Sequence, residues 1–193
     1  MSPSAPRGVA DVVIKVGGAL IHEPSALDDA AHAIAAASRA HRVLVVPGGG
    51  PFADAVRTAD RDVGLGDDAA HWMAILGMEQ YAHLLAERIA GARIVECVEE
   101  IERAYGDACV PVLAPYRWLR SADPLPHTWE VTSDSIAAWV AGAVNARTLV
   151  LIKPVADETR ALVDAYFGRA VPEHLRVEVL SASDVGALGS TLG

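Results

Sequence analysis

The stretch Val13-Ile-Lys15-Val-Gly17-Gly18-Ala-Leu20 decides the fold, because a lysine interrupts an apolar strand and two glycines follow at its carboxyl end. A buried lysine requires an anionic partner. Glycines remove side chains from the path of a ligand and let main-chain N–H groups face phosphate oxygens. The stretch therefore predicts a strand that ends at a phosphate site, with Lys15 as a point charge. Taken alone, it also fits an edge-strand lysine beside a tight turn.

A second glycine cluster, Val46-Pro-Gly48-Gly49-Gly50-Pro51-Phe52, also follows an apolar strand. Proline suits the first turn of a helix. Three consecutive glycines are conformationally costly, which is easier to explain if the backbone approaches a ligand at a helix N-terminus than if the loop is merely flexible. Parallel strands end at one edge of a sheet, where ligands bind in open α/β folds. We therefore expect the two glycine clusters to lie at the same edge.

A third cluster, Trp129-Glu-Val-Thr132-Ser133-Asp134-Ser135, precedes a predicted helix that begins near Ser133 and ends near Asn145. The Ser133 side chain can cap this helix, and asparagine tolerates the left-handed conformation of a helix end. The apolar strand that follows ends at Lys153. Asp134 is expected to hold the lysine ammonium groups, with a helix-terminus carboxylate as the alternative. Lys153 is alternatively a solvated strand end.

Short β-branched runs alternate with Ala-rich helical segments along the whole chain, which is typical of parallel strands joined by crossover helices. We predict an α/β fold, a three-layer sandwich with a central, mainly parallel sheet, in a single domain over residues 1–193. A long helix is expected from about Asp68 to Ala90, with Gly91 closing it. The predicted strands are Asp11–Val16, Arg42–Val46, Ile94–Val98, Val110–Ala114, Thr148–Ile152 and Arg176–Leu180.

Composition limits the classes of partner. The 193 residues carry a formal net charge of −9, which opposes a general attraction to nucleic acid or to anionic lipid. The first residues lack the apolar run of a signal peptide, and no later run is long enough to span a bilayer, so we expect a cytoplasmic protein with no membrane partner. The two cysteines and seven histidines show no metal-ligand spacing, so no protein metal site is expected.

Over about Val13 to Lys153, these three clusters resemble the amino acid kinase family, which includes acetylglutamate kinase, carbamate kinase, uridylate kinase and the small kinases of methanofuran biosynthesis. The resemblance implies the amino acid kinase fold, with an acceptor half over about residues 1–130 and a nucleotide half over about 131–193. It implies that Asp134 organises the lysines. The residues that it places around the phosphoryl group and acceptor are Lys15, Gly17, Gly18, Gly48, Gly49 and Gly50.

The chain departs from larger family members after Lys153. It reads Lys153-Pro154-Val-Ala-Asp157 where many relatives have a Ser/Thr-Asp or Thr-Lys-Val-Asp-Gly nucleotide segment, and it ends without the later glycine-rich segment that carries another catalytic lysine. Lys153, Pro154 and Asp157 are expected to contact the nucleotide. The short C-terminal region is similar to the compact kinases of methanofuran biosynthesis.

The resemblance implies an ATP-dependent phosphotransferase that uses Mg²⁺, forms a homo-oligomer and acts on a small anionic acceptor. No side chain stands out as a general base, which fits an acceptor that is already an anion. The expected acceptor is [5-(aminomethyl)furan-3-yl]methyl phosphate, whose ammonium group would meet Asp68 or Glu79. The alternatives are a uridylate or acetylglutamate type of kinase, or a noncatalytic protein that binds an anion or nucleotide on the same fold.

Overall fold

The computed structural model describes residues 8–154 and 163–193, and within these ranges six strands form one sheet. The strand order is β3-β4-β2-β1-β5-β6, and every pair of neighbours is parallel. This confirms the α/β fold with a central parallel sheet. The strands are β1 (Val12–Val16), β2 (Val43–Pro47), β3 (Ala92–Val95), β4 (Val110–Leu113), β5 (Thr148–Lys153) and β6 (Arg176–Ser181).

The predicted strand bounds agree to within one or two residues at every strand except β3. The prediction Ile94–Val98 was wrong at its carboxyl end, because Val98 begins helix α4 (Val98–Gly106). Two glutamates occupy the first turn of α4, where carboxylates favour a helix N-terminus. The Glu100 side chain also accepts a hydrogen bond from the Glu96 N–H at 2.8 Å, which ends the strand early.

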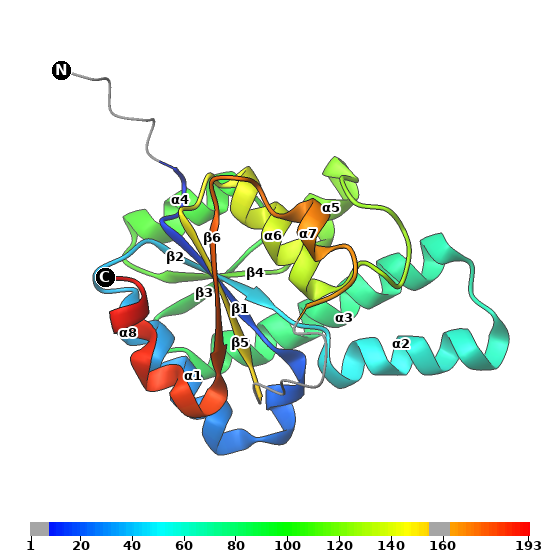
Figure 1. Ribbon diagram of the computed structural model, residues 1–193, viewed down its shortest axis with the longest axis horizontal. Helices are drawn as coiled ribbons and strands as arrows, with labels where there is room; N and C mark the ends of the chain where they lie inside the picture. The colour runs from blue at the N-terminus through cyan, green and yellow to red at the C-terminus, as the bar shows by residue number, and fades with distance from the viewer. Residues whose placement is uncertain (1–7, 155–162) are drawn as a thin grey trace.

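Helices cover both faces of the sheet, giving the predicted three layers (Figure 1). Along β1, Val13 packs into one apolar core, whereas Ile14 packs into the core on the opposite face. Strand residues alternate between faces, so both cores need helices to cover them. One layer contains α4, α5 (Tyr116–Ala122), α6 (Ser133–Ala143) and α7 (Phe167–Ala170). The other contains α1 (Pro24–Ala37), the C-terminal half of α3 (Asp67–Arg88), η2 (Ala182–Ala187) and α8 (Leu188–Thr191).

A helical hairpin projects from the carboxyl ends of the strands (Figure 1). It consists of α2 (Gly50–Val63) and the N-terminal half of α3, and a short 3-10 helix, η1 (Gly18–His22), lies at its base. Gly64 ends α2 in a left-handed conformation with φ +68°, which costs glycine little. The segment 123–132 connects α5 to α6 beside this hairpin. None of the helices that the structure describes is long and apolar enough to cross a membrane.

Candidate active site

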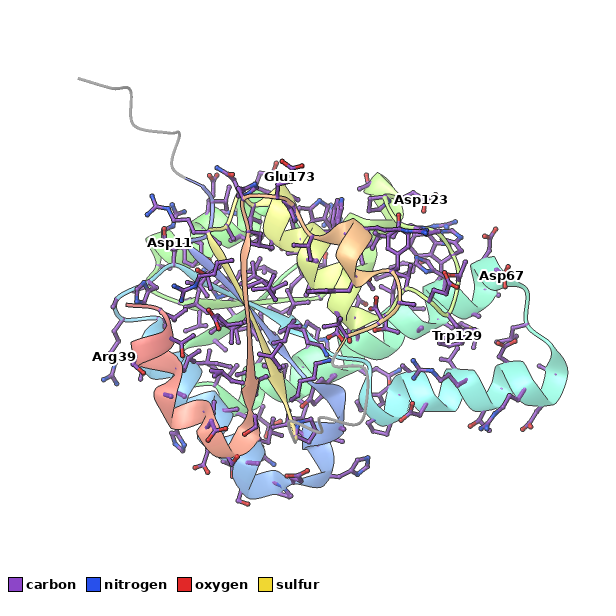
Figure 2. All side chains as sticks on the ribbon, in the orientation of Figure 1. Asp11, Arg39, Asp67, Asp123, Trp129 and Glu173 are labelled. Carbon is purple, nitrogen blue, oxygen red and sulfur yellow. The ribbon has the colours of Figure 1, made fainter. Side chains whose placement is uncertain are left out.

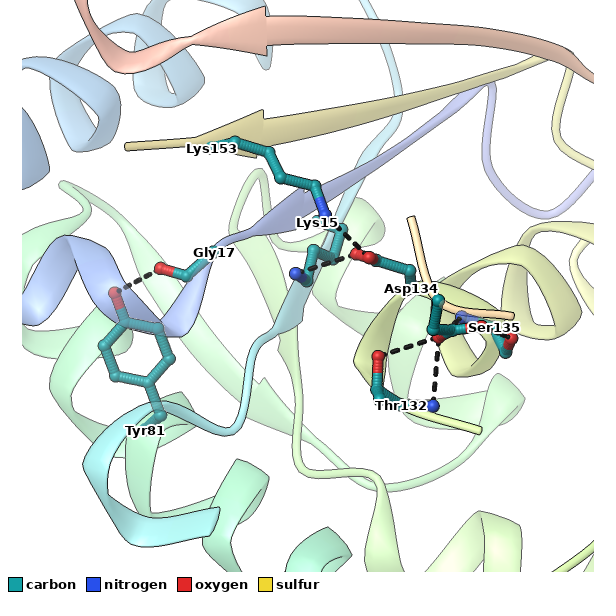
Figure 3. Close-up of polar contacts among 8 residues, drawn as sticks. Lys15, Gly17, Tyr81, Thr132, Asp134, Ser135 and Lys153 are labelled. Carbon is teal, nitrogen blue, oxygen red and sulfur yellow. Dashed lines mark hydrogen bonds and ion pairs between the residues drawn. The ribbon is translucent and has the colours of Figure 1, made fainter. Parts of the chain in front are cut away.

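Both lysines of the sequence contact a single carboxylate (Figure 3). Lys15 Nζ lies 2.9 Å from Asp134 Oδ1, and Lys153 Nζ lies 2.6 Å from Asp134 Oδ2. The two lysines come from the neighbouring strands β1 and β5, and Asp134 comes from the first turn of α6. Lys15 and Asp134 are only 5% and 4% exposed. Two ammonium groups and one carboxylate therefore meet at the carboxyl edge of the sheet.

Burial and ion pairing shift the pKa values of Lys15 and Asp134 in opposite directions. Burial lowers the pKa of Lys15, and the charge of Asp134 offsets this only in part. Burial would raise the pKa of Asp134, but the charges of Lys15 and Lys153 outweigh it and hold that pKa below its usual value. Within the described residues, Asp134 Oδ1 has no partner in hydrogen-bond geometry, so its contact with Lys15 is an ion pair. The Lys15 ammonium therefore retains donors for another anion.

The two glycine clusters touch each other at the ends of β1 and β2. The Gly48 N–H donates to the Val16 carbonyl at 2.8 Å. A Cβ atom added at Gly18 would lie 2.0 Å from the Gly50 nitrogen, and one added at Gly48 would lie 2.4 Å from the Gly18 nitrogen. Gly50 also has φ +53°, which disfavours other residues. Glycine is therefore required here because two backbones meet without room for side chains.

Three main-chain N–H groups at this junction remain open to a ligand. The Gly17 and Gly48 N–H groups donate to strand carbonyls at 2.8 Å each. The N–H groups of Gly18, Gly49 and Gly50 have no acceptor within residues 8–154 and 163–193. These same three glycines line a cleft. A cluster of unpaired amides beside a positively charged group is suited to bind phosphate oxygens.

The cleft has a volume of about 230 Å³ and lies between the glycine junction, the hairpin and segment 123–132. The apolar side chains in its walls include Ala53, Ala70, Ala74, Ile75, Met78, Val131 and Ile136. Polar side chains of the hairpin and segment 123–132 also line it, namely Asp54, Arg57, Asp67, His71, Thr128, Trp129, Thr132 and Ser133. Figure 2 shows Trp129 near α2 and Asp67 near the start of α3. The cleft reaches Ser133, next to Asp134, and so approaches the lysine cluster.

Asp164 is a site residue that sequence reasoning missed. Its carboxylate accepts hydrogen bonds from the Thr132 N–H at 3.0 Å, the Thr132 hydroxyl at 2.7 Å and the Ser135 N–H at 3.0 Å. The Ser135 hydroxyl also donates to it. The predicted cap at Ser133 was wrong, because no side chain at the start of α6 caps the helix. Asp164 performs this role from about 30 residues away and so orients the turn that carries Asp134.

Tyr81 is a second residue that no local pattern indicated. This side chain of α3 is fully buried, and its hydroxyl donates to the Gly17 carbonyl at 3.3 Å (Figure 3). Burial raises the pKa of Tyr81 far above its ordinary value, so the hydroxyl keeps its proton. The contact joins the first glycine cluster to helix α3.

The other predicted residues lie outside the centre of the site. Asp68 is not among the described residues that line the cleft, and its carboxylate oxygen is 2.6 Å from His127 Nδ1. That hydrogen bond holds the pKa of Asp68 below its usual value. Glu79 accepts a hydrogen bond from the Tyr116 N–H at 3.0 Å. Among the described residues that line the cleft, the hairpin carboxylates are Asp54 and Asp67, not Asp68 or Glu79.

The nucleotide segment is only partly described. Pro154 directly follows Lys153 at the end of β5 and is half-buried. Asp157 lies outside the described residues. In the parts of the chain that the structure describes, no group of three or more His, Cys, Asp or Glu side chains is placed to hold a metal ion.

The sequence pattern of the amino acid kinase family matches residues 12–157. The chain is 24% identical over 178 residues to [5-(aminomethyl)furan-3-yl]methyl phosphate kinase of Methanocaldococcus jannaschii. These residues cover 92% of this chain and 77% of that protein. Among solved structures, the uridylate kinase of Archaeoglobus fulgidus superposes with a TM-score of 0.69 at 17% identity, covering 93% of this chain and 95% of that one. The UMP kinase of Bacillus anthracis has a TM-score of 0.73 at 13% identity, with 96% and 93% covered. At these identities the solved structures show a shared fold.

Proposed function

The chain belongs to the amino acid kinase family and is a kinase, and on that premise we propose that it moves the terminal phosphoryl group of ATP onto a small anionic acceptor held in the cleft. The observation that carries this proposal is the pairing of both lysines with Asp134 beside the open amides of the glycine junction. Phosphoryl transfer requires alignment of the reactants and compensation of negative charge. Ammonium groups and main-chain amides meet both requirements.

Each part of the site has a role in this proposal. Lys15 and Lys153 contact oxygens of the phosphoryl group, and Asp134 holds the two ammonium groups apart and in place. The open amides of Gly18, Gly49 and Gly50 are shared between the remaining oxygens of the phosphoryl group and the acceptor. Gly17 and Gly48 keep the two backbones in contact.

ATP binds in the second half of the chain, where we propose that Lys153, Pro154 and Asp157 contact the nucleotide. Mg²⁺ arrives with the phosphates of ATP, where it usually keeps several water ligands. Bound there, it would supply positive charge to the oxygens of the donor.

We further propose that the acceptor is [5-(aminomethyl)furan-3-yl]methyl phosphate. This is the substrate in the name of the Methanocaldococcus jannaschii relative, and three features of the cleft suit it. The glycine junction accepts its phosphate, the apolar wall accepts its ring, and the rim carboxylates Asp54 and Asp67 are available to an ammonium group, with Asp68 next to them. An acceptor phosphate oxygen attacks the γ-phosphorus, the bond from that phosphorus to ADP breaks, and a diphosphate forms. The attacking oxygen is already an anion, so no general base is needed.

The test is an acceptor screen with the purified full-length chain, ATP and Mg²⁺, in which ADP release is measured and the product is identified by phosphorus NMR. The furan phosphate is expected to give the diphosphate, and Lys15→Ala is expected to give no turnover. If UMP or acetylglutamate is phosphorylated and the furan phosphate is not, the proposed acceptor is wrong and the phosphorylated compound takes its place. Nucleotide and acceptor binding without any ADP release would favour a noncatalytic role.

We also propose that the protein is a cytoplasmic homo-oligomer. Met73 and Leu76 on α3 are 39% and 40% exposed, and Val63 at the end of α2 is 73% exposed. Exposed apolar side chains of this size are candidates for a subunit contact. Light scattering during size-exclusion chromatography would show a mass above that of one chain, and a monomeric mass would contradict the proposal.

A further inference from the structure

The segment 123–132, called the strap below, forms one wall of the cleft. Thr128, Trp129, Val131 and Thr132 of the strap line the cleft opposite the hairpin. The strap contacts the hairpin at two separate points, one on α3 and one on α2. Whatever opens these contacts therefore changes the wall against which an acceptor packs.

The contact with α3 is made by His127. Its Nδ1 lies 2.6 Å from Asp68 Oδ1, and its Nε2 lies 2.9 Å from Asp123 Oδ1. Its ring stacks on His71 with centroids 4.1 Å apart and meets the edge of Trp72 at 5.0 Å. The His127 side chain is only 17% exposed. The imidazole thus bridges a carboxylate of α3 and a carboxylate of the strap itself.

This bridge requires a doubly protonated ring. Carboxylate oxygens accept hydrogen bonds, and a neutral imidazole has only one N–H to donate. Partial burial lowers the pKa of His127, but the hydrogen bonds and charges of Asp68 and Asp123 outweigh it and leave the pKa above 6.5. The bridge is therefore intact at lower pH, and it is lost as pH rises through this raised pKa.

The neighbouring charged groups support this assignment. Asp68 and His71 face His127 from α3, Arg120 faces the same cluster from α5, and Asp123 faces it from the start of the strap. Burial, followed by the charge of His127, lowers the pKa of His71 to about 4. His71 is therefore a neutral stacking partner, and it does not compete for the two carboxylates.

The contact with α2 involves no histidine. The Trp129 indole N–H donates to Asp60 Oδ2 at 2.7 Å. The Arg57 guanidinium lies over the Trp129 ring, 4.8 Å from its centroid. This point keeps the strap attached to the hairpin when the His127 bridge opens.

We propose that His127 is a positioning residue that fastens the strap across the acceptor cleft, so that acceptor binding weakens when its bridge to Asp68 and Asp123 is lost. The effect on acceptor binding rests on the proposed function. The effect on the order of the strap does not, because it follows from contacts within the chain.

The first experiment measures the strap without any substrate. Hydrogen exchange of residues 124–131 is followed by mass spectrometry below and well above the ordinary histidine pKa of about 6.5, with correction for intrinsic exchange rates. In the wild type, protection is expected to fall at the higher pH. In His127→Gln, protection of the strap amides is expected to be low at both pH values. At the lower pH it is expected to be roughly tenfold below that of the wild type, because the variant loses a charge-assisted hydrogen bond. Equal protection in both proteins at both pH values would overturn the proposal.

Two further variants keep this result interpretable. His32→Gln changes an exposed histidine of α1 and is expected to leave exchange in the strap unchanged. Asp68→Ala removes the carboxylate through which the bridge reaches α3, at a position where the side chain is 87% exposed. If His127→Gln fails to fold, Asp68→Ala is expected to show the same loss of protection, and unchanged protection in it overturns the proposal.

The second experiment measures turnover. His127→Gln is expected to raise the KM for the acceptor roughly tenfold, with kcat and the KM for ATP nearly unchanged, because the residue shapes the cleft wall only. A fall in kcat at constant KM would contradict a positioning role. If no acceptor is phosphorylated, the proposed function fails, and the exchange experiment still decides whether His127 fastens the strap.

Discussion

The two ends of the cleft are stabilised in opposite ways. At the lysine end, buried ions and touching backbones leave almost no freedom, since Lys15 and Asp134 are nearly inaccessible and Gly18 abuts Gly50. At the strap end, contacts are made by side chains that reach across long sequence separations, and Asp68 is 87% exposed. The difference indicates that the lysine end of the cleft is rigid, whereas the strap end is adjustable.

Removing one charged side chain at each end of the cleft is expected to give the largest effect and tests whether the two ends differ. Lys15→Ala is expected to lower kcat by a factor of about 10³ or more, because a buried ammonium beside the reacting phosphate is lost. Arg57→Ala, at the strap end, is expected to change mainly the KM of the acceptor. Steady-state kinetics with ATP and the identified acceptor, together with circular dichroism, measure both. A similar fall in kcat for the two variants would show that the ends do not differ in this way.

The glycine junction gives the next largest effect. A side chain at Gly18 has no room beside the backbone of Gly50, so Gly18→Ala is expected to lower the free energy of unfolding by about 2 to 4 kcal/mol and to remove activity. Gly106→Ala is the matched control, because nothing lies within 4 Å of an added Cβ there. Urea unfolding of both variants measures the difference. Equal stability would mean that the two backbones separate easily.

The distant cap of α6 should matter less than the junction. Asp164→Asn keeps the size of the side chain but can lose the carboxylate oxygen, Oδ2, that accepts from both Thr132 and Ser135, so the unfolding free energy is expected to fall by about 1 to 3 kcal/mol. A moderate fall in kcat is also expected, since the turn that carries Asp134 loses its support. Asp29→Asn, on an exposed position of α1, is the control. Unchanged kcat with lowered stability would limit Asp164 to a role in folding.

The smallest expected effect is a shift in the pKa of Lys15. Because the sequence contains only two lysines, labelling lysine with carbon-13 gives only two side-chain spin systems by NMR. Burial holds the pKa of Lys15 below 10.5, and Asp134 opposes this shift. Asp134→Asn is therefore expected to lower the pKa of Lys15 further. A rise of that pKa in the variant would contradict the paired geometry.

The sequence predicted the positions of residues correctly where the pattern is local, or where the order of parallel strands brings several local patterns to one edge of the sheet. The glycine clusters and Lys153 all follow apolar strands, and the rule that parallel strands end at one edge brings them together. It failed at β3, where acidic residues after Glu96 start a helix within an apolar run. It also missed Asp164 and Tyr81, whose contacts with Ser135 and Gly17 span 29 and 64 residues.

The amino-acid sequence by itself determined the parallel α/β architecture and singled out the residues that we propose bind the phosphoryl group, because strand periodicity, glycine and buried lysine each impose a local physical requirement. Only the tertiary structure decided which amides stay open, which distant carboxylate caps α6, and how His127 joins the strap to α3. Those contacts depend on the positions of surface segments that approach one another after folding, and no local pattern encodes that approach.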